Sequence, residues 1–138
     1  DDGRTITLAA LKGTPVVVYF YPKDDTSGCT KEALAFSAAL PKFARAGVTV
    51  IGVSKDSLES HAKFRGKHKL KVTLGSDAEL KMAQDWGVWG EKTLYGRKYM
   101  GMERATFLVN AKGVIVQAWR KVKVPGHVEA VLEAAKSL

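Results

Sequence analysis

The chain has 138 residues, of which 46% are hydrophobic and 26% are charged, and its formal net charge is +8 at pH 7. This composition excludes a disordered chain and the length supports one hydrophobic core, so we expect residues 1–138 to form a single domain. No apolar run reaches the roughly 18 residues of a membrane span and no signal-peptide pattern opens the sequence, so we expect a cytoplasmic protein without a membrane partner.

The first predicted elements are a buried strand and two short helices. Val16–Tyr21 reads VVVYFY, a run of β-branched and aromatic residues that is typical of a central parallel strand, and Pro22 ends it. A helical pattern of about ten residues starts at Gly28. Its predicted apolar stripe consists of Leu34, Ala35, Ala38 and Ala39. Pro41 is expected to start a second short helix, which Gly47 closes.

A second strand and a longer helix come next. Val48–Val53, VTVIGV, has the composition of another buried strand. Ser54–Lys69 predicts a helix whose start either Asp56 or Ser57 could cap. The order so far is strand, helix, strand, helix, which is typical of an α/β protein.

The densest basic run, His61–Lys71, lies within and just after this second helix. It reads HAKFRGKHKLK, and its charges alternate with Phe64 and Leu70 as on a solvated helix face. No set of stacking aromatic residues and no nucleic-acid motif accompanies it, so we expect no nucleic-acid partner.

The third α/β unit is shorter and is followed by an irregular stretch. Val72–Leu74 predicts a short strand, and residues 76–87 predict a helix in which Ser76 and Glu79 have the spacing of a capping box. Residues 87–104 contain several glycines among aromatic and charged residues. We expect them to form a long ordered loop, which in a compact domain is usually functional.

The last elements complete a mixed sheet. Thr106–Val109 and Val114–Trp119 flank the turn sequence NAKG and predict a hairpin. Val124–Leu138 predicts a final amphipathic helix with four residues on its inner face, Val128, Val131, Leu132 and Ala135. Alternating strands and helices with a terminal hairpin predict an α/β fold with a mixed central sheet and helices on both faces.

The chain has one cysteine, Cys29, and its position indicates a reactive thiol. A single cysteine excludes an internal disulfide framework and a zinc site of paired cysteines, and leaves either an inert buried thiol or a reactive one. Cys29 lies between a strand end and the first turn of a helix, where unpaired backbone N–H groups collect in an open α/β sheet. A helix N-terminus and a nearby cation lower the pKa of a thiol to about 3.5–7.5. Thr26, three residues earlier, can bring its hydroxyl to the same helix end.

The segment Pro22–Cys29, PKDDTSGC, resembles the active-site loop of peroxiredoxins, in which Pro, Thr and a peroxidatic Cys recur at this spacing. The resemblance covers nearly the whole chain. CTKEA after the cysteine, VIGVSKDS, GVWGEK, YGRKYMG and ERATFLVN are similar to the bacterioferritin-comigratory or Q-type peroxiredoxins. It implies a thioredoxin-like fold, the reduction of hydrogen peroxide and organic hydroperoxides, and a functional arginine before the TFLV strand, here Arg104.

These residues suit the chemistry that the resemblance implies. Cys29 would attack a peroxide oxygen as thiolate, while Thr26 and the backbone N–H groups of residues 28 and 29 would hold the oxygens. Arg104 would favour the thiolate and the departing negative charge, and Pro22 would shield the sulfenate. Because fixed donors supply the polarity, we expect neither a metal nor an organic cofactor.

Three departures from the family pattern change the expected cycle. Ser27 stands where the family usually has Pro, and it could cap the helix. Many relatives carry a resolving cysteine five residues after the first, where this chain has Leu34, and others carry it near the position of Arg65. We therefore expect a monomer whose sulfenic acid reacts with an outside thiol, such as thioredoxin, glutaredoxin or glutathione.

Other interpretations remain beside this one. The chain could be a peroxide sensor that passes the oxidation of Cys29 to a partner protein. A thioredoxin-type disulfide oxidoreductase is disfavoured, because that chemistry uses a C-x-x-C pair and Thr26 stands where the first cysteine of the pair would be. Glu32 either orients Arg104 or complements the helix dipole. Because the three histidines have no acidic partner at ligand spacing, we expect none of them to be catalytic. They are His61, His68 and His127.

Overall fold

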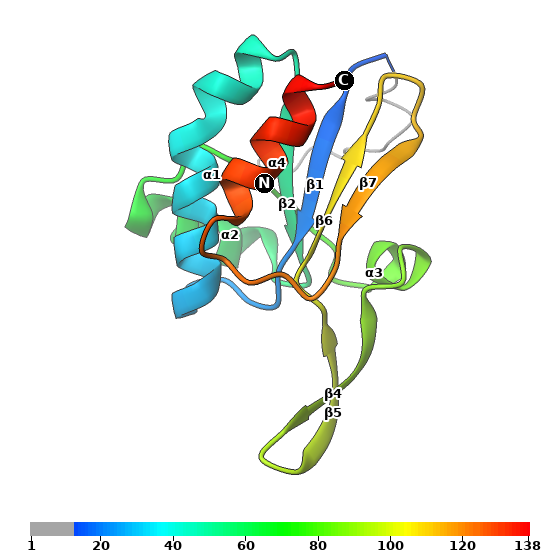
Figure 1. The fold of residues 1–138 in the computed structure, drawn as a ribbon. Helices are drawn as coiled ribbons and strands as arrows, with labels where there is room; N and C mark the ends of the chain where they lie inside the picture. Colours follow the sequence, from blue (N-terminus) through cyan, green and yellow to red (C-terminus); the bar gives the residue numbers. More distant parts are fainter. Residues whose placement is uncertain (1–12) are drawn as a thin grey trace.

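The computed structural model describes residues 13–138, which form seven strands and four helices (Figure 1). In chain order these are β1 (Val16–Phe20), α1 (Ser27–Arg45), β2 (Thr49–Ser54), α2 (Leu58–His68), β3 (Thr73–Ser76), α3 (Lys81–Asp85), β4 (Trp89–Leu94), β5 (Arg97–Met102), β6 (Ala105–Val109), β7 (Ile115–Trp119) and α4 (His127–Lys136).

The main sheet has five strands in the order β3-β2-β1-β6-β7. Its central strand is β1, which runs parallel to β2 and antiparallel to β6, with Val18 opposite Ile51 on one side and Phe107 on the other. Every residue of β1 is buried, as its unbroken run of β-branched and aromatic side chains predicted. The prediction of a mixed sheet with a buried central strand is therefore confirmed.

Helices cover both faces of this sheet, as predicted. On one face, α1, α2 and α4 pack over Val17 and Tyr19 through aromatic and aliphatic side chains such as Phe36, Phe64 and Val131. Figure 1 shows α1 and α4 side by side on this face. The other face carries a second cluster, to which α3 contributes Ala83 and the following segment contributes Trp86 and Val88.

The first helix is continuous, so the prediction of two short helices was wrong. Pro41 lies inside α1, where it has no N–H to donate to the carbonyl of Ser37, one turn earlier. Phe36 and Phe43 are both fully buried, one on each side of the proline. Their burial in one core offsets the lost hydrogen bond. The helix stops before Gly47, which has the left-handed φ of +76° that glycine adopts most easily.

The predicted stripe of α1 is half confirmed, because Ala35 and Ala39 pack against the core but the other two residues do not. Leu34 is 43% exposed and Ala38 is exposed. The buried residues of the helix are Cys29, Glu32, Ala33, Phe36 and Phe43. The two phenylalanines set the rotation of the helix because each buries far more apolar area than an alanine. This rotation turns Cys29 toward the sheet.

The predicted helix over residues 76–87 is reduced to one short turn, and its capping box does not form. The hydroxyl of Ser76 donates to the carbonyl of Asp56, 2.6 Å away. The carboxylate of Asp77 instead accepts from the backbone N–H groups of Met82 and Ala83. The Asp77 carboxylate, and not the Ser76 hydroxyl, is therefore the acceptor at the start of α3, which begins only at Lys81.

Residues 87–104 are not a loop but contain a two-stranded hairpin. Strands β4 and β5 pair along their length, and Figure 1 shows the hairpin projecting away from the sheet. Tyr95 and Gly96 form its turn, both with positive φ as in the tight turns that join two strands. Tyr95 is 96% exposed at this tip. The glycines and aromatic residues of this stretch suggested a loop, so the alternating pattern of two paired strands was overlooked.

Several other predictions are confirmed. The hydroxyl of Ser57 caps α2 by accepting from the N–H of Ser60, 3.1 Å away, which decides between the two candidate caps. Strands β6 and β7 form the terminal hairpin. The final helix begins at His127, three residues later than predicted, and buries the four expected residues. No helix within residues 13–138 is both long and apolar enough to cross a membrane.

We predict that Gly52→Ala destabilises the fold. A Cβ atom at Gly52 would lie 2.5 Å from Cζ of Tyr19, whose buried ring stacks on Phe36 and cannot move away. We expect a loss of about 1–3 kcal/mol in the free energy of unfolding, measured by urea titration. Gly66→Ala in α2 is the control, because its Cβ would meet no atom within 4 Å. This control should gain about 0.5–1 kcal/mol.

Candidate active site

The loop between β1 and α1 brings Cys29 to the N-terminal end of α1. The backbone N–H of Tyr21 donates to the carbonyl of Val53 and so extends the pairing of β1 with β2 by one residue. Thr26 is the N-cap residue of α1, and its carbonyl accepts from the N–H of Thr30. Cys29 therefore lies in the first turn, where N–H groups without helical partners and the helix dipole favour negative charge. It is a free thiol and only 1% exposed.

Arg104, the arginine that the family resemblance implied, lies beside the thiol. It stands between β5 and β6, and its Nη2 donates to Cys29 Sγ at 3.3 Å. Its Nη1 donates to Oε1 of Glu32 at 2.7 Å. Burial acts to lower the pKa of Arg104, but Glu32 and Cys29 outweigh burial and raise it, so the side chain stays charged.

Gly28 allows this close approach. A Cβ atom at Gly28 would lie 3.1 Å from Nη2 of Arg104, which is tighter than an ordinary van der Waals contact. Any larger side chain there would press the guanidinium away from Cys29. No sequence pattern indicates this role, because the contact joins residues on two distant segments.

Glu32 orients Arg104, which decides between the two interpretations of this residue. Its side chain is fully buried, and within the described part of the chain its Oε2 atom has no hydrogen-bond partner. Burial raises the pKa of Glu32 to about 7, although Arg104 acts in the opposite direction. The single guanidinium is shared with Cys29 and only partly offsets the desolvation of the carboxylate.

Tyr19 adds a third polar group beneath the thiol. Its hydroxyl is buried without a hydrogen-bond partner among residues 13–138. Burial raises its pKa well above the ordinary value, and the nearby Glu32 and Cys29 add to the effect. The hydroxyl therefore stays neutral beside these two acids. Sequence analysis missed it because Tyr19 belongs to an apolar strand.

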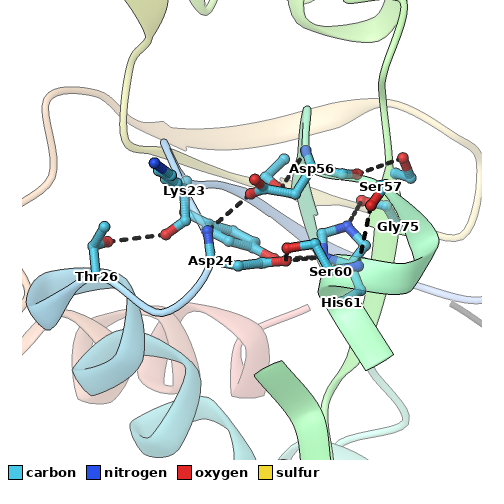
Figure 2. A network of polar contacts seen from close by, with 11 residues as sticks. Lys23, Asp24, Thr26, Asp56, Ser57, Ser60, His61 and Gly75 are labelled. Atoms are coloured by element: carbon cyan, nitrogen blue, oxygen red, sulfur yellow. Dashed lines mark hydrogen bonds and ion pairs between the residues drawn. The ribbon is translucent and has the colours of Figure 1, made fainter. Parts of the chain in front are cut away.

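Thr26 and Pro22 lie in the same loop, but the structure gives neither a hydrogen bond to the sulfur. The Thr26 hydroxyl donates to the carbonyl of Lys23 at 2.9 Å and caps no helical N–H group (Figure 2). Ser27 is the first residue of α1, so the prediction that it caps the helix was wrong. Pro22 is half-buried just after β1. The catalytic roles of Thr26 and Pro22 stay predictions.

Two of the three histidines have acidic partners, although none of these partners stands at ligand spacing along the sequence. His61 Nδ1 lies 2.7 Å from Oδ2 of Asp24, and His68 Nε2 lies 2.7 Å from Oδ1 of Asp25. These partners are 37 and 43 residues away along the chain, so no local spacing reveals them. His127 instead contacts the hydroxyl of Thr106, and burial lowers its pKa to about 4.

Within residues 13–138, no cluster of three or more His, Cys, Asp or Glu side chains could hold a metal ion. The polar groups described above near Cys29 are the Arg104 guanidinium, the Glu32 carboxyl group, the Tyr19 phenol and the N-terminal end of α1. This arrangement can stabilise negative charge on sulfur and on an oxygen bound beside it.

The model of the AhpC/TSA family matches residues 1–118. The chain belongs to the AhpC/TSA family. Among its relatives, peroxiredoxin Bcp of Xanthomonas campestris is 48% identical over 135 residues, which cover 98% of this chain and 84% of that protein. Peroxiredoxin Bcp of Bacillus subtilis is 46% identical over 138 residues, which cover 100% of this chain and 88% of the relative.

A solved structure gives the same result. The bacterioferritin comigratory protein of Xanthomonas campestris, studied for its alkyl peroxide reduction activity, superposes with a TM-score of 0.94 and 47% identity. The superposition covers 98% of this chain and 85% of that structure. The predicted resemblance to peroxiredoxins, the thioredoxin-like fold and the assignment to the thiol peroxidases are therefore confirmed.

We predict that Glu32→Gln changes the dependence of stability on pH. A carboxyl whose pKa rises from 4.5 to about 7 on folding keeps its proton in the folded state while the unfolded state releases it. The wild type therefore loses stability as pH rises from about 4.5 to 7, by about 3 kcal/mol at 1.36 kcal/mol per pKa unit. Glutamine removes this loss.

The measurement is urea unfolding of both proteins between pH 4 and pH 8. We expect the stability of Glu32→Gln relative to the wild type to increase with pH across this range. The exposed Glu79→Gln is the control and should give a constant difference. A constant difference for Glu32→Gln as well would mean that the pairing with Arg104 fully offsets the burial of the carboxylate.

Proposed function

We propose that Cys29 is the peroxidatic nucleophile of this thiol peroxidase and that a thiol from another molecule resolves its sulfenic acid. The observation that carries the proposal is the hydrogen bond of 3.3 Å from Arg104 Nη2 to Cys29 Sγ at the N-terminal end of α1. A guanidinium in this position favours the thiolate, which is the reactive form of the thiol. The alkyl peroxide reduction activity of the related Xanthomonas campestris protein supports the choice of substrate.

In the first step, the Cys29 thiolate attacks one oxygen of a hydroperoxide, ROOH. An S–O bond forms and the O–O bond breaks, so sulfur is oxidised to sulfenic acid while the second oxygen leaves as alkoxide and takes up a proton to give ROH. Negative charge moves from sulfur to the leaving oxygen. Arg104 and the N–H groups of residues 28 and 29 are the proposed donors to this charge. The Thr26 hydroxyl, whose hydrogen goes to the carbonyl of Lys23, is proposed to hold the peroxide by accepting from its O–H, and Pro22 is proposed to shield the sulfenate.

In the second step, an outside thiolate attacks the sulfur of Cys29, forms a mixed disulfide and releases the hydroxyl as water. A second thiol then reduces this disulfide and restores Cys29. The chain offers no second cysteine among its 138 residues, and Leu34 and Arg65 stand where relatives carry resolving cysteines. Thioredoxin, glutaredoxin and glutathione supply thiols of the required chemistry.

We also propose that the protein acts as a monomer in the cytoplasm. Cys29, Arg104 and Glu32 come from one chain and already contact one another, so the site needs no residue from a second copy. A lone reactive thiol that depends on outside thiols suits the reducing cytoplasm, where those reductants are abundant.

We predict that Cys29→Ser abolishes peroxide turnover and leaves the fold intact, because a serine hydroxyl does not ionise near neutral pH. The assay follows consumption of hydrogen peroxide and of an alkyl hydroperoxide with each of the three reductants, and circular dichroism checks the fold. Retained turnover would show that Cys29 is not the nucleophile. A wild type that consumes one equivalent of peroxide and then stops with every reductant would instead favour the sensor function.

We predict that mass spectrometry after one equivalent of peroxide shows a monomer with one added oxygen. In the presence of a small thiol, the product should be a mixed disulfide, and excess peroxide should accumulate sulfinic acid. A Cys29–Cys29 dimer is disfavoured because the residue is 1% exposed, while a disulfide requires Cα atoms about 4.4–6.8 Å apart. Quantitative covalent dimer would contradict resolution by an outside thiol. Cys29→Ser, which should gain no mass, is the control.

A further inference from the structure

The loop that leads from β1 to Cys29 is anchored by a buried carboxylate. Asp24 lies near the middle of this loop and is only 7% exposed. Its Oδ1 accepts from the hydroxyl of Tyr21 at 2.6 Å. Its Oδ2 contacts two side chains of α2, the hydroxyl of Ser60 at 2.8 Å and Nδ1 of His61 at 2.7 Å (Figure 2). Two side chains of helix α2 therefore bind Asp24 and hold the loop in place.

Each ring nitrogen of His61 faces a hydrogen-bond acceptor. The ring is fully buried, with Nδ1 facing the Asp24 carboxylate and Nε2 lying 3.0 Å from the carbonyl oxygen of Gly75. Burial acts to raise the pKa of Asp24, but its hydrogen bonds, first of all that from His61, outweigh burial and lower it. A carboxylate only accepts hydrogen bonds, so Nδ1 is the donor in the contact between His61 and Asp24.

The backbone on both sides of Asp24 transmits this anchor to the first turn of α1. The N–H of Asp24 donates to Oδ2 of Asp56 at 2.8 Å, which fixes the start of the loop. The hydroxyl of Thr26 donates to the carbonyl of Lys23 at 2.9 Å, and the N–H of Thr30 donates to the carbonyl of Thr26 at 2.8 Å. Together with the contact between His61 and Asp24, these bonds link α2 through the loop to the first turn of α1, which contains Cys29.

A second contact between the loop and α2 is exposed and serves as a comparison. Asp25 pairs with Lys67 and His68, each at 2.7 Å. Exposed ion pairs contribute little because water competes for both charges. The contact of Asp24 with His61 differs because it is buried, so loss of the His61 donor leaves a buried carboxylate with only the hydroxyls of Tyr21 and Ser60.

We propose that His61 is a positioning residue for Cys29. By holding Asp24 from α2, it keeps the loop and the first turn of α1 where Nη2 of Arg104 reaches the sulfur. This inference deepens the peroxidase function proposed above and rests on it for its kinetic readout. A second readout, alkylation of the thiol, does not involve peroxide.

The test compares two substitutions that each keep one nitrogen of the ring. The side-chain amide of His61→Asn places a donor at the position of Nδ1, which faces Asp24, whereas that of His61→Gln places one at the position of Nε2, which faces Gly75. Each variant loses one buried hydrogen bond, so both should be destabilised. Only His61→Gln should lose the hydrogen bond from His61 to Asp24, which leaves Ser60 as the one donor from α2 to this carboxylate.

The measurements are the second-order rate of sulfenic acid formation with hydrogen peroxide, the rate of Cys29 alkylation by iodoacetamide and the urea midpoint. We expect both rates to fall roughly tenfold in His61→Gln, the effect of one lost charge-assisted hydrogen bond, and to stay within about threefold of the wild type in His61→Asn. Asp24→Asn should match His61→Gln, and the double variant should add little to either. His68→Gln, on the same helix, should leave both rates unchanged.

Equal rates in the Asn and Gln variants, or rates that follow the urea midpoints, would overturn the proposal and leave His61 a purely structural residue. If His61→Gln does not fold, Asp24→Asn alters the acceptor of the same contact, and unchanged rates there would also overturn the proposal. A wild type that shows no peroxide turnover refutes the peroxidase function instead, and the alkylation rates still decide the role of His61.

Discussion

The guanidinium of Arg104 lies between two acidic groups at the N-terminal end of α1, and the rest of the site is arranged around this contact. One nitrogen donates to the sulfur of Cys29 and another to the carboxyl of Glu32. The sheet order makes the contact unavoidable, because β6, which follows Arg104, pairs with β1, which leads to Cys29. Two segments 75 residues apart are thus brought together by adjacent central strands.

Stability and reactivity oppose one another at this contact. The burial that isolates Cys29 from water also buries Glu32, raising its pKa to about 7, and leaves the hydroxyl of Tyr19 without a partner in the described structure. Buried polar groups without partners cost free energy that the apolar clusters on both faces of the sheet must offset. In return, the charge of Arg104 acts on the sulfur through a medium of low dielectric constant, where its effect is larger than in water.

The sequence predicted the parts of the molecule that depend on local pattern. The apolar run of β1 and the thiol in the first turn of α1 follow from neighbouring residues, and Arg104 followed from the family resemblance. Contacts between distant segments were missed, including the pairing of His61 with Asp24 and the room that Gly28 leaves for the guanidinium. Competing local signals also misled: the proline at position 41 suggested a break, although burial of the flanking phenylalanines outweighs its lost hydrogen bond.

The burial of Cys29 affects its reaction with peroxide and its later reaction with a thiol differently. Hydrogen peroxide is little larger than water and can reach a sulfur in a narrow site, whereas a thiol on a protein must bring its own backbone close to Cys29, which is 1% exposed. In the proposed cycle every reducing equivalent comes from another molecule. The hydrogen bonds that hold the loop for peroxide attack would then also resist the opening that a protein thiol requires. A small thiol such as glutathione needs less opening, and the balance between the two reductants therefore depends on how firmly α2 holds Asp24.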